Sequence, residues 1–141
     1  MYKLLFLMLL VSYSTAQGQS ASVNNELNAH YKDGGMEGFQ DYLRKNLITP
    51  DSRGLFKAKG KMYVSFSIDS TGNNSIEEIK NDITFTGDLM EKSAFKRGLF
   101  ITFCENDIKR VFASMPKWVP KMENNVPVKS KLTVPINIIS K

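Results

Sequence analysis

Apolar and polar residues alternate most regularly over residues 128–139, near the C-terminus. Such alternation is typical of a half-buried β-strand. One face would carry Val128, Leu132, Val134, Ile136 and Ile138, and the other Lys129, Lys131, Thr133 and Asn137. Pro135 interrupts this strand, and proline inside a strand is found at sheet edges because it has no N–H to donate. We therefore expect a C-terminal strand with one unpaired side.

The same alternation runs through residues 61–69, which predicts a second strand. Residues 70–74 follow it and are polar, with Gly72 and two asparagines. Gly and Asn tolerate positive φ, so this stretch favours a turn. Isoleucines return over residues 75–85, although three charged residues interrupt them. We predict an antiparallel hairpin whose second strand is irregular.

Two helices are predicted from apolar residues that recur at spacings of three and four. The first begins near Met36 and ends before Pro50, since proline disfavours helix in the residue that precedes it. The second covers residues 108–115, with Asn106 or Asp107 as its N-cap and Pro116 after its end. Their apolar faces carry Met36, Phe39, Leu43 and Leu47 in the first, and Ile108, Val111, Phe112 and Met115 in the second.

The segment between the hairpin and the second helix, residues 86–105, is less regular. Its pattern predicts a short helix around residues 89–95 and an extended apolar piece over residues 99–103. The order helix, strand, strand, helix, strand then predicts an α+β fold, with a small antiparallel three-stranded sheet and helices packed on one face.

The N-terminus has the three parts of a secretory signal, assigned to residues 1–16. Lys3 supplies positive charge, residues 4–11 are all apolar, and Ser14 and Ala16 are small residues at the expected cleavage site. The apolar run is shorter than the roughly 20 residues that span a bilayer. An uncleaved anchor and a buried N-terminal helix are the alternatives. No cysteine follows the run, so lipid anchoring is not expected.

After cleavage, residues 17–33 are expected to form a flexible polar leader and residues 34–141 a single domain. The loss of Lys3 would lower the net charge from +5 to +4. The basic residues are dispersed apart from Lys57, Lys59 and Lys61, so we expect no nucleic-acid partner. We interpret the three lysines as a solvated loop, with contact to an acidic partner or a membrane surface as the alternative.

Residues that could support catalysis or metal binding are few. His30 lies in the predicted leader without an expected partner, and Cys104 is interpreted as a small core residue. The stretch that starts at Asp69 resembles a calcium loop, but Lys80 stands where the bidentate acid should be, so a hairpin turn is the simpler explanation. We therefore expect neither an enzyme nor a cofactor or metal site.

Several segments resemble the C-terminal domain of TonB energy transducers, especially its Bacteroidetes branch. The most specific are ASMPKWVP at residues 113–120, VPV at 126–128 and LTVPINI at 132–138. The segments GGMEGFQDYL at 34–43, LITP at 47–50 and KMYVSFSID at 61–69, together with Gly72, are also similar. The resemblance covers about residues 34–139, and relative to the family residues 86–105 form an enlarged insertion.

The resemblance implies a periplasmic module that binds the TonB box, a short extended segment of outer-membrane transporters. The peptide would add beside the final strand as an extra strand. The implied partner-binding residues are Lys129, Lys131, Thr133, Val134, Pro135 and Asn137. Trp118, Pro116 and Gly72 would be structural. ExbB/ExbD-type inner-membrane proteins are implied partners only if the N-terminus is retained. Whether the protein forms a homodimer is left open.

Working members of this family have a transmembrane helix and usually a proline-rich spacer, and we expect neither here unless residues 4–11 stay uncleaved. A free domain could bind a transporter but could not pull on it. The alternative function is an envelope structural or adaptor domain that reuses the fold to bind another periplasmic or cell-wall component.

Overall fold

The computed structural model describes residues 28–48, 50–52, 54–88 and 92–140. The predicted signal over residues 1–16 and most of the predicted leader lie outside these residues. Among the described residues, no helix is long and apolar enough to cross a membrane. The elements are β1 His30–Tyr31, α2 Gly35–Asn46, β2 Lys57–Ile68, β3 Asn74–Thr86, α4 Ala94–Ala113, β4 Trp118–Val119, β5 Lys121–Glu123, β6 Val126–Val128 and β7 Ser130–Ile139.

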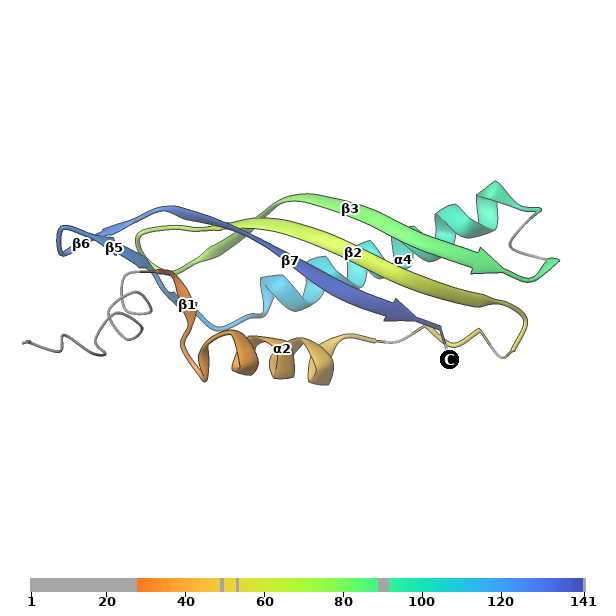
Figure 1. Cartoon of the computed structure of the whole chain (residues 1–141), viewed down its shortest axis with the longest axis horizontal. Coiled ribbons are helices and arrows are strands. Elements are labelled where there is room, and N and C mark those ends of the chain that lie inside the picture. Colours follow the sequence, from red (N-terminus) through yellow and green to blue (C-terminus); the bar gives the residue numbers. More distant parts are fainter. Residues whose placement is uncertain (1–27, 49, 53, 89–91, 141) are drawn as a thin grey trace, which may run out of the picture.

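The centre of the molecule is a three-stranded antiparallel sheet with the strand order β3-β2-β7. Both long helices, α2 and α4, lie on the same face of this sheet (Figure 1). Phe66 of β2 shows this directly, because its ring contacts Phe39 of α2 and Phe112 of α4. The predicted α+β fold is therefore confirmed, as is the position of the C-terminal strand at a sheet edge.

One end of the domain is filled by an aromatic cluster that we call the Trp118 end. It consists of Tyr31, Phe39, Phe66, Phe112 and Trp118, each no more than 3% exposed. The ring centroids of Trp118 lie 5.1 Å from Phe39 and 5.4 Å from Phe66. Edge-to-face contacts at such separations add to the free energy gained by burying the rings.

Two short strand pairs accompany the central sheet, and the sequence pattern did not predict them. β1 pairs with β4, so Tyr31 lies opposite Trp118, and β5 pairs with β6. His30 was expected in a flexible leader, but it belongs to β1, and its Nδ1 hydrogen-bonds the carbonyl of Asn28. The reason is Tyr31, whose buried ring holds the end of the predicted leader in the core.

The second helix is much longer than its apolar pattern predicted. α4 is one helix over Ala94–Ala113, so the extended piece predicted at residues 99–103 is wrong. Asn106 and Asp107 lie inside this helix, and the N-cap is Ser93, whose Oγ accepts a hydrogen bond from the Lys96 N–H. A serine oxygen in this position satisfies one of the free N–H groups at a helix start.

β2 begins earlier than predicted, at Lys57, so the assignment of the three neighbouring lysines to a loop is wrong. Their side chains are exposed, while Ala58 between them is 1% exposed. A Cβ on Gly60 would lie 2.0 Å from the carbonyl oxygen of Asp82, so only glycine fits there. The inward positions are thus filled by small residues, which give almost no apolar signal in the sequence.

The predicted hairpin turn between β2 and β3 is confirmed. Asp69 organises this turn through its side-chain carboxylate. Its Oδ1 accepts hydrogen bonds from the N–H groups of Thr71 and Asn73, at 2.8 and 3.0 Å. The hydroxyl of Thr71 donates to the same oxygen at 2.7 Å. These hydrogen bonds favour the charged carboxylate and hold the pKa of Asp69 at about 2.

Candidate peptide-binding edge

The candidate site is the outer edge of β7, which pairs with β2 on one side only. The N–H of Ser140 donates to the Ala58 carbonyl at 2.9 Å, which shows that even-numbered residues here point their main-chain groups toward β2. The β2–β7 register has no break from Ser130 to Ile139. Main-chain directions alternate along a strand, so the odd-numbered residues of β7 turn their N–H and C=O groups outward.

Pro135 is one of these outward-facing residues, opposite Tyr63 in the register. Its missing N–H therefore falls on the open side of β7 and costs no hydrogen bond to β2. This agrees with the edge position that the proline predicted. The outward row consists of five carbonyls and four N–H groups, contributed by Lys131, Thr133, Pro135, Asn137 and Ile139, with the proline supplying a carbonyl alone.

The same five residues place their side chains on the sheet face that the helices leave uncovered, and all five are exposed. Thr133 Oγ1 lies 2.8 Å from Ser65 Oγ of β2, which fixes its side chain on this face. Tyr63 beside Pro135 is also exposed. The edge therefore adjoins a polar surface and not the hydrophobic core.

An ion pair crosses this surface at the start of β7. Lys131 Nζ lies 2.6 Å from Glu77 Oε2, and Lys129 Nζ lies 3.8 Å from Glu77 Oε1. Glu77 belongs to β3, so its carboxylate reaches over β2 to the edge strand. The hydrogen bond and the charge of Lys131 lower the pKa of Glu77, and Glu77 raises the pKa of Lys131 in return.

Val134 does not belong to this site, although it was predicted as a partner-binding residue. Its side chain is 6% exposed and lies in the core, and its main chain faces β2. Both follow from its even position in the strand. Ile139 was missed, although it is exposed at an odd position. Alternation counted from Pro135 would have excluded Val134 from the predicted partner-binding residues and included Ile139.

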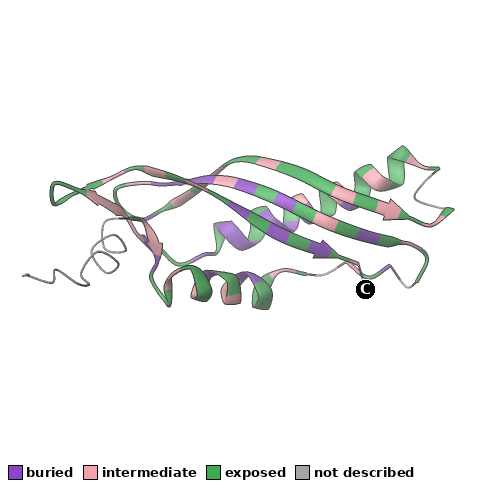
Figure 2. Cartoon of the chain, in the orientation of Figure 1, coloured by how far each residue is buried: buried purple, intermediate pink, exposed green. Residues whose placement is uncertain are grey.

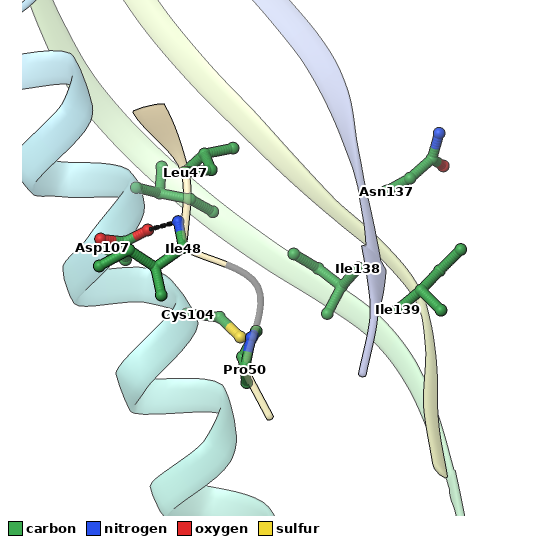
Figure 3. A pocket seen from close by; sticks show the side chains of 9 residues that line it. Leu47, Ile48, Pro50, Cys104, Asp107, Asn137, Ile138 and Ile139 are labelled. Carbon is green, nitrogen blue, oxygen red and sulfur yellow. Dashed lines mark hydrogen bonds between the residues drawn. The ribbon is translucent and has the colours of Figure 1, made fainter. Parts of the chain in front are cut away.

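A small cavity lies beneath the C-terminal end of β7 (Figure 3). Its volume is about 50 Å³, and it is bounded by the segment after α2, by α4 and by residues 137–139 of β7. Figure 3 shows Ile138 pointing toward α4, whereas Asn137 and Ile139 point to the other side of the strand. Asn137 is therefore presented to solvent, as its predicted role in partner binding requires.

A buried carboxylate holds the wall of this cavity in place. Asp107 Oδ2 accepts a hydrogen bond from the Ile48 N–H at 2.7 Å, and Asp107 Oδ1 accepts one from Arg110 Nε at 2.8 Å. Arg110 Nη2 also donates to the carbonyl of Asn46 at 2.8 Å. These bonds join the end of α2 to α4.

The residues predicted as structural lie at the Trp118 end. Trp118 is 3% exposed, and its indole N–H donates to Met115 Sδ at 3.2 Å. Its backbone N–H donates to the carbonyl of Gly72 at 2.8 Å, and a Cβ on Gly72 would lie 2.1 Å from the Trp118 carbonyl oxygen. Gly72 has a φ of 87°, a conformation that favours glycine. Pro116 is exposed and follows the end of α4.

The described residues contain no group of three or more His, Cys, Asp or Glu side chains that could hold a metal ion. Cys104 is 4% exposed, and burial raises the pKa of its thiol to about 11. A thiol in that state is a poor nucleophile at neutral pH.

Comparison of the chain with protein-family models, with curated proteins and with solved structures gave no match. The family resemblance of the sequence therefore stays a prediction.

Proposed function

We propose that this protein is a periplasmic TonB-like binding module, which captures an extended peptide segment of outer-membrane transporters by strand addition along β7. The observation that carries the proposal is the outward-facing row of main-chain groups on β7. An incoming strand can hydrogen-bond to such a row, as in other domains that recognise peptides by strand addition. The resemblance of residues 113–138 to the TonB C-terminal domain names the class of peptide, the TonB box.

Affinity and selectivity would come from different groups at this edge. Main-chain hydrogen bonds are the same for every peptide sequence, so they supply affinity without selectivity. Side chains beside the edge distinguish peptides, and here these belong to Lys131, Thr133 and Asn137. Pro135 divides the edge, so a bound peptide would have one carbonyl without a partner at the middle of the site.

Amide chemical shifts provide a direct test. The ¹⁵N-labelled chain would be titrated with TonB-box peptides from transporters of the same organism, and with scrambled peptides as a control. We expect shifts concentrated at the odd-numbered amides of β7, because these N–H groups would change from water to a peptide carbonyl. An absence of shifts in residues 129–138 at millimolar peptide would contradict the proposal and favour the alternative of an adaptor domain.

Two proline variants distinguish an effect on peptide binding at the β7 edge from an effect on the stability of the fold. Asn137→Pro removes an outward N–H, so the domain should stay folded while peptide affinity falls about twofold to tenfold, the effect of one hydrogen bond. Ile136→Pro removes an inward N–H and a buried side chain, so it should destabilise the domain by at least about 3 kcal/mol. Equal peptide affinity of Asn137→Pro and the unchanged chain would place binding elsewhere.

A further inference from the structure

Large apolar side chains are exposed on the first half of α4. Phe95, Leu99 and Phe103 recur at every fourth residue and so lie along one side of the helix. We call these three residues the α4 stripe. Phe95 is 75% exposed, and Leu99 and Phe103 are 55% and 44% exposed. Exposed apolar residues are ordinary when they are scattered, but a contiguous group of them marks an interaction surface.

The α4 stripe lies at the end of the domain opposite the aromatic cluster. Here the core narrows to three rings, Phe56, Phe85 and Phe100, with Phe100 centroids 5.7 and 5.4 Å from the other two. We call this the Phe100 end. Figure 1 shows the start of α4 at the tip of the molecule, beside the end of β3. Leu55 precedes Phe56 at this end and is also exposed, at 62%.

The α4 stripe is accompanied by three positively charged residues, and Glu105 is the first acidic residue of α4 after them. Residues 92–104 contain Lys92, Lys96 and Arg97 and no acidic residue. The first turn of α4 thus has no carboxylate, although the helix dipole favours negative charge at that position. Lys92 and Lys96 are exposed, and neither forms an ion pair with another described residue. An anionic partner would therefore be favoured both by the lysines and by the helix terminus.

We propose that the Phe100 end docks onto an anionic lipid surface, with the α4 stripe entering the interface and Lys92 and Lys96 contacting phosphate groups. Amphipathic helices that carry Phe and Leu together with basic residues lie in membrane interfaces, with the apolar side chains at the acyl boundary. A second copy of the chain fits less well, because pairing two stripes would bring their lysines together. A peptide also fits less well, since a three-quarters exposed Phe95 protrudes from the surface and does not lie in a groove.

This surface is separate from the peptide-binding edge. It uses the outer side of α4 and the segment before β2, whereas the edge uses β7. Lipid docking would hold the domain against a membrane while leaving the β7 edge open to a peptide. Failure of one proposal therefore leaves the other unaffected.

A tryptophan reporter tests the docking at the stripe itself. Leu99→Trp would be compared with Tyr63→Trp, which lies on the sheet face that the helices leave uncovered. Native Trp118 is buried and stays insensitive to lipid in both variants. Vesicles of phosphatidylglycerol or phosphatidylcholine, with and without brominated acyl chains, would be added to the full chain. The shared N-terminal apolar run is the same in every sample.

We expect the emission of Leu99→Trp to shift to shorter wavelength and to be quenched by brominated chains in phosphatidylglycerol vesicles, while Tyr63→Trp is unchanged. Equal quenching at the two positions, equal quenching in phosphatidylcholine, or none at position 99 would overturn the proposal. A wavelength shift that depends on protein concentration without lipid would overturn it in favour of a second copy.

Charge variants test the lysines in the same assay. In the Leu99→Trp background, Lys92→Ala with Lys96→Ala should lower the partition coefficient about 25-fold, since one lysine near an anionic surface contributes about fivefold. Lys32→Ala with Lys117→Ala removes the same charge at the Trp118 end and should change it less than twofold. Equal effects of the two pairs would contradict docking through the Phe100 end.

Discussion

The two ends of this domain are built from the same kinds of residue, but the aromatic side chains are enclosed at one end and partly exposed at the other. At the Trp118 end, aromatic rings from both helices and the sheet enclose one another and almost no ring surface reaches water. At the Phe100 end, Phe56 and Phe85 are only partly buried and α4 turns further aromatic residues outward. Figure 2 shows the change along α4, from an exposed start to a buried C-terminal part. The Trp118 end therefore contributes to stability, whereas the Phe100 end exposes apolar side chains to solvent.

The largest expected effect is at the Trp118 end. Phe66→Ala should destabilise the domain by about 3–5 kcal/mol, because it opens a cavity among rings from α2, α4 and Trp118. Phe95→Ala is the matched change at the other end and should stay within about 0.5 kcal/mol, because Phe95 is exposed. Urea unfolding followed by circular dichroism measures both. Similar losses would show that the two ends do not differ as described.

A smaller effect is expected between the ends, at Asp107. Asp107→Ala should cost about 2 kcal/mol, because the Ile48 N–H and Arg110 lose a buried acceptor. Asp41→Ala removes an exposed ion pair with Arg44 and should cost less than about 0.5 kcal/mol. Hydrogen exchange of the Ile48 amide gives a local readout. Unchanged exchange in Asp107→Ala would mean that this hydrogen bond does not hold the segment after α2.

The smallest effect concerns pH and the hairpin turn at the Trp118 end. Because the folded pKa of Asp69 is about 2, below its ordinary value of 3.8, its charge stabilises the fold above pH 3.8. That stabilisation should disappear as pH falls from 3.8 to 2. Thermal unfolding of Asp69→Asn should therefore show a weaker pH dependence in this range than the unchanged chain. Identical slopes for the two proteins would contradict the hydrogen-bonded turn.

Much of the central sheet could be predicted from alternation alone. The hairpin, the C-terminal strand and its open edge all follow from residues that must face either the core or water. The start of β2 was hidden because Ala58 and Gly60 fill its inward positions without adding hydrophobicity. The short pair of β1 and β4 depends on Tyr31 meeting Trp118, a contact between residues far apart in sequence.

The length of α4 could not be read from its periodicity for a different reason. Its first half has apolar residues on two sides, Phe100 and Cys104 toward the core and the α4 stripe toward solvent. Because apolar residues lie on both sides of the helix, the spacing of three and four is obscured. The sequence therefore predicted an extended piece. The apolar spacing thus fails to predict the helix in the part of α4 where apolar residues also lie outside the core.

Pro135 also affects how the protein behaves among copies of itself. An open strand edge is a template for uncontrolled stacking of like chains, and the hazard grows with the length of the uninterrupted row. A missing donor in the middle of β7 divides the outward row into two short runs, which makes a long continuous ladder between like chains less favourable. Pro135 thus discourages edge-to-edge aggregation of β7 when the protein is crowded.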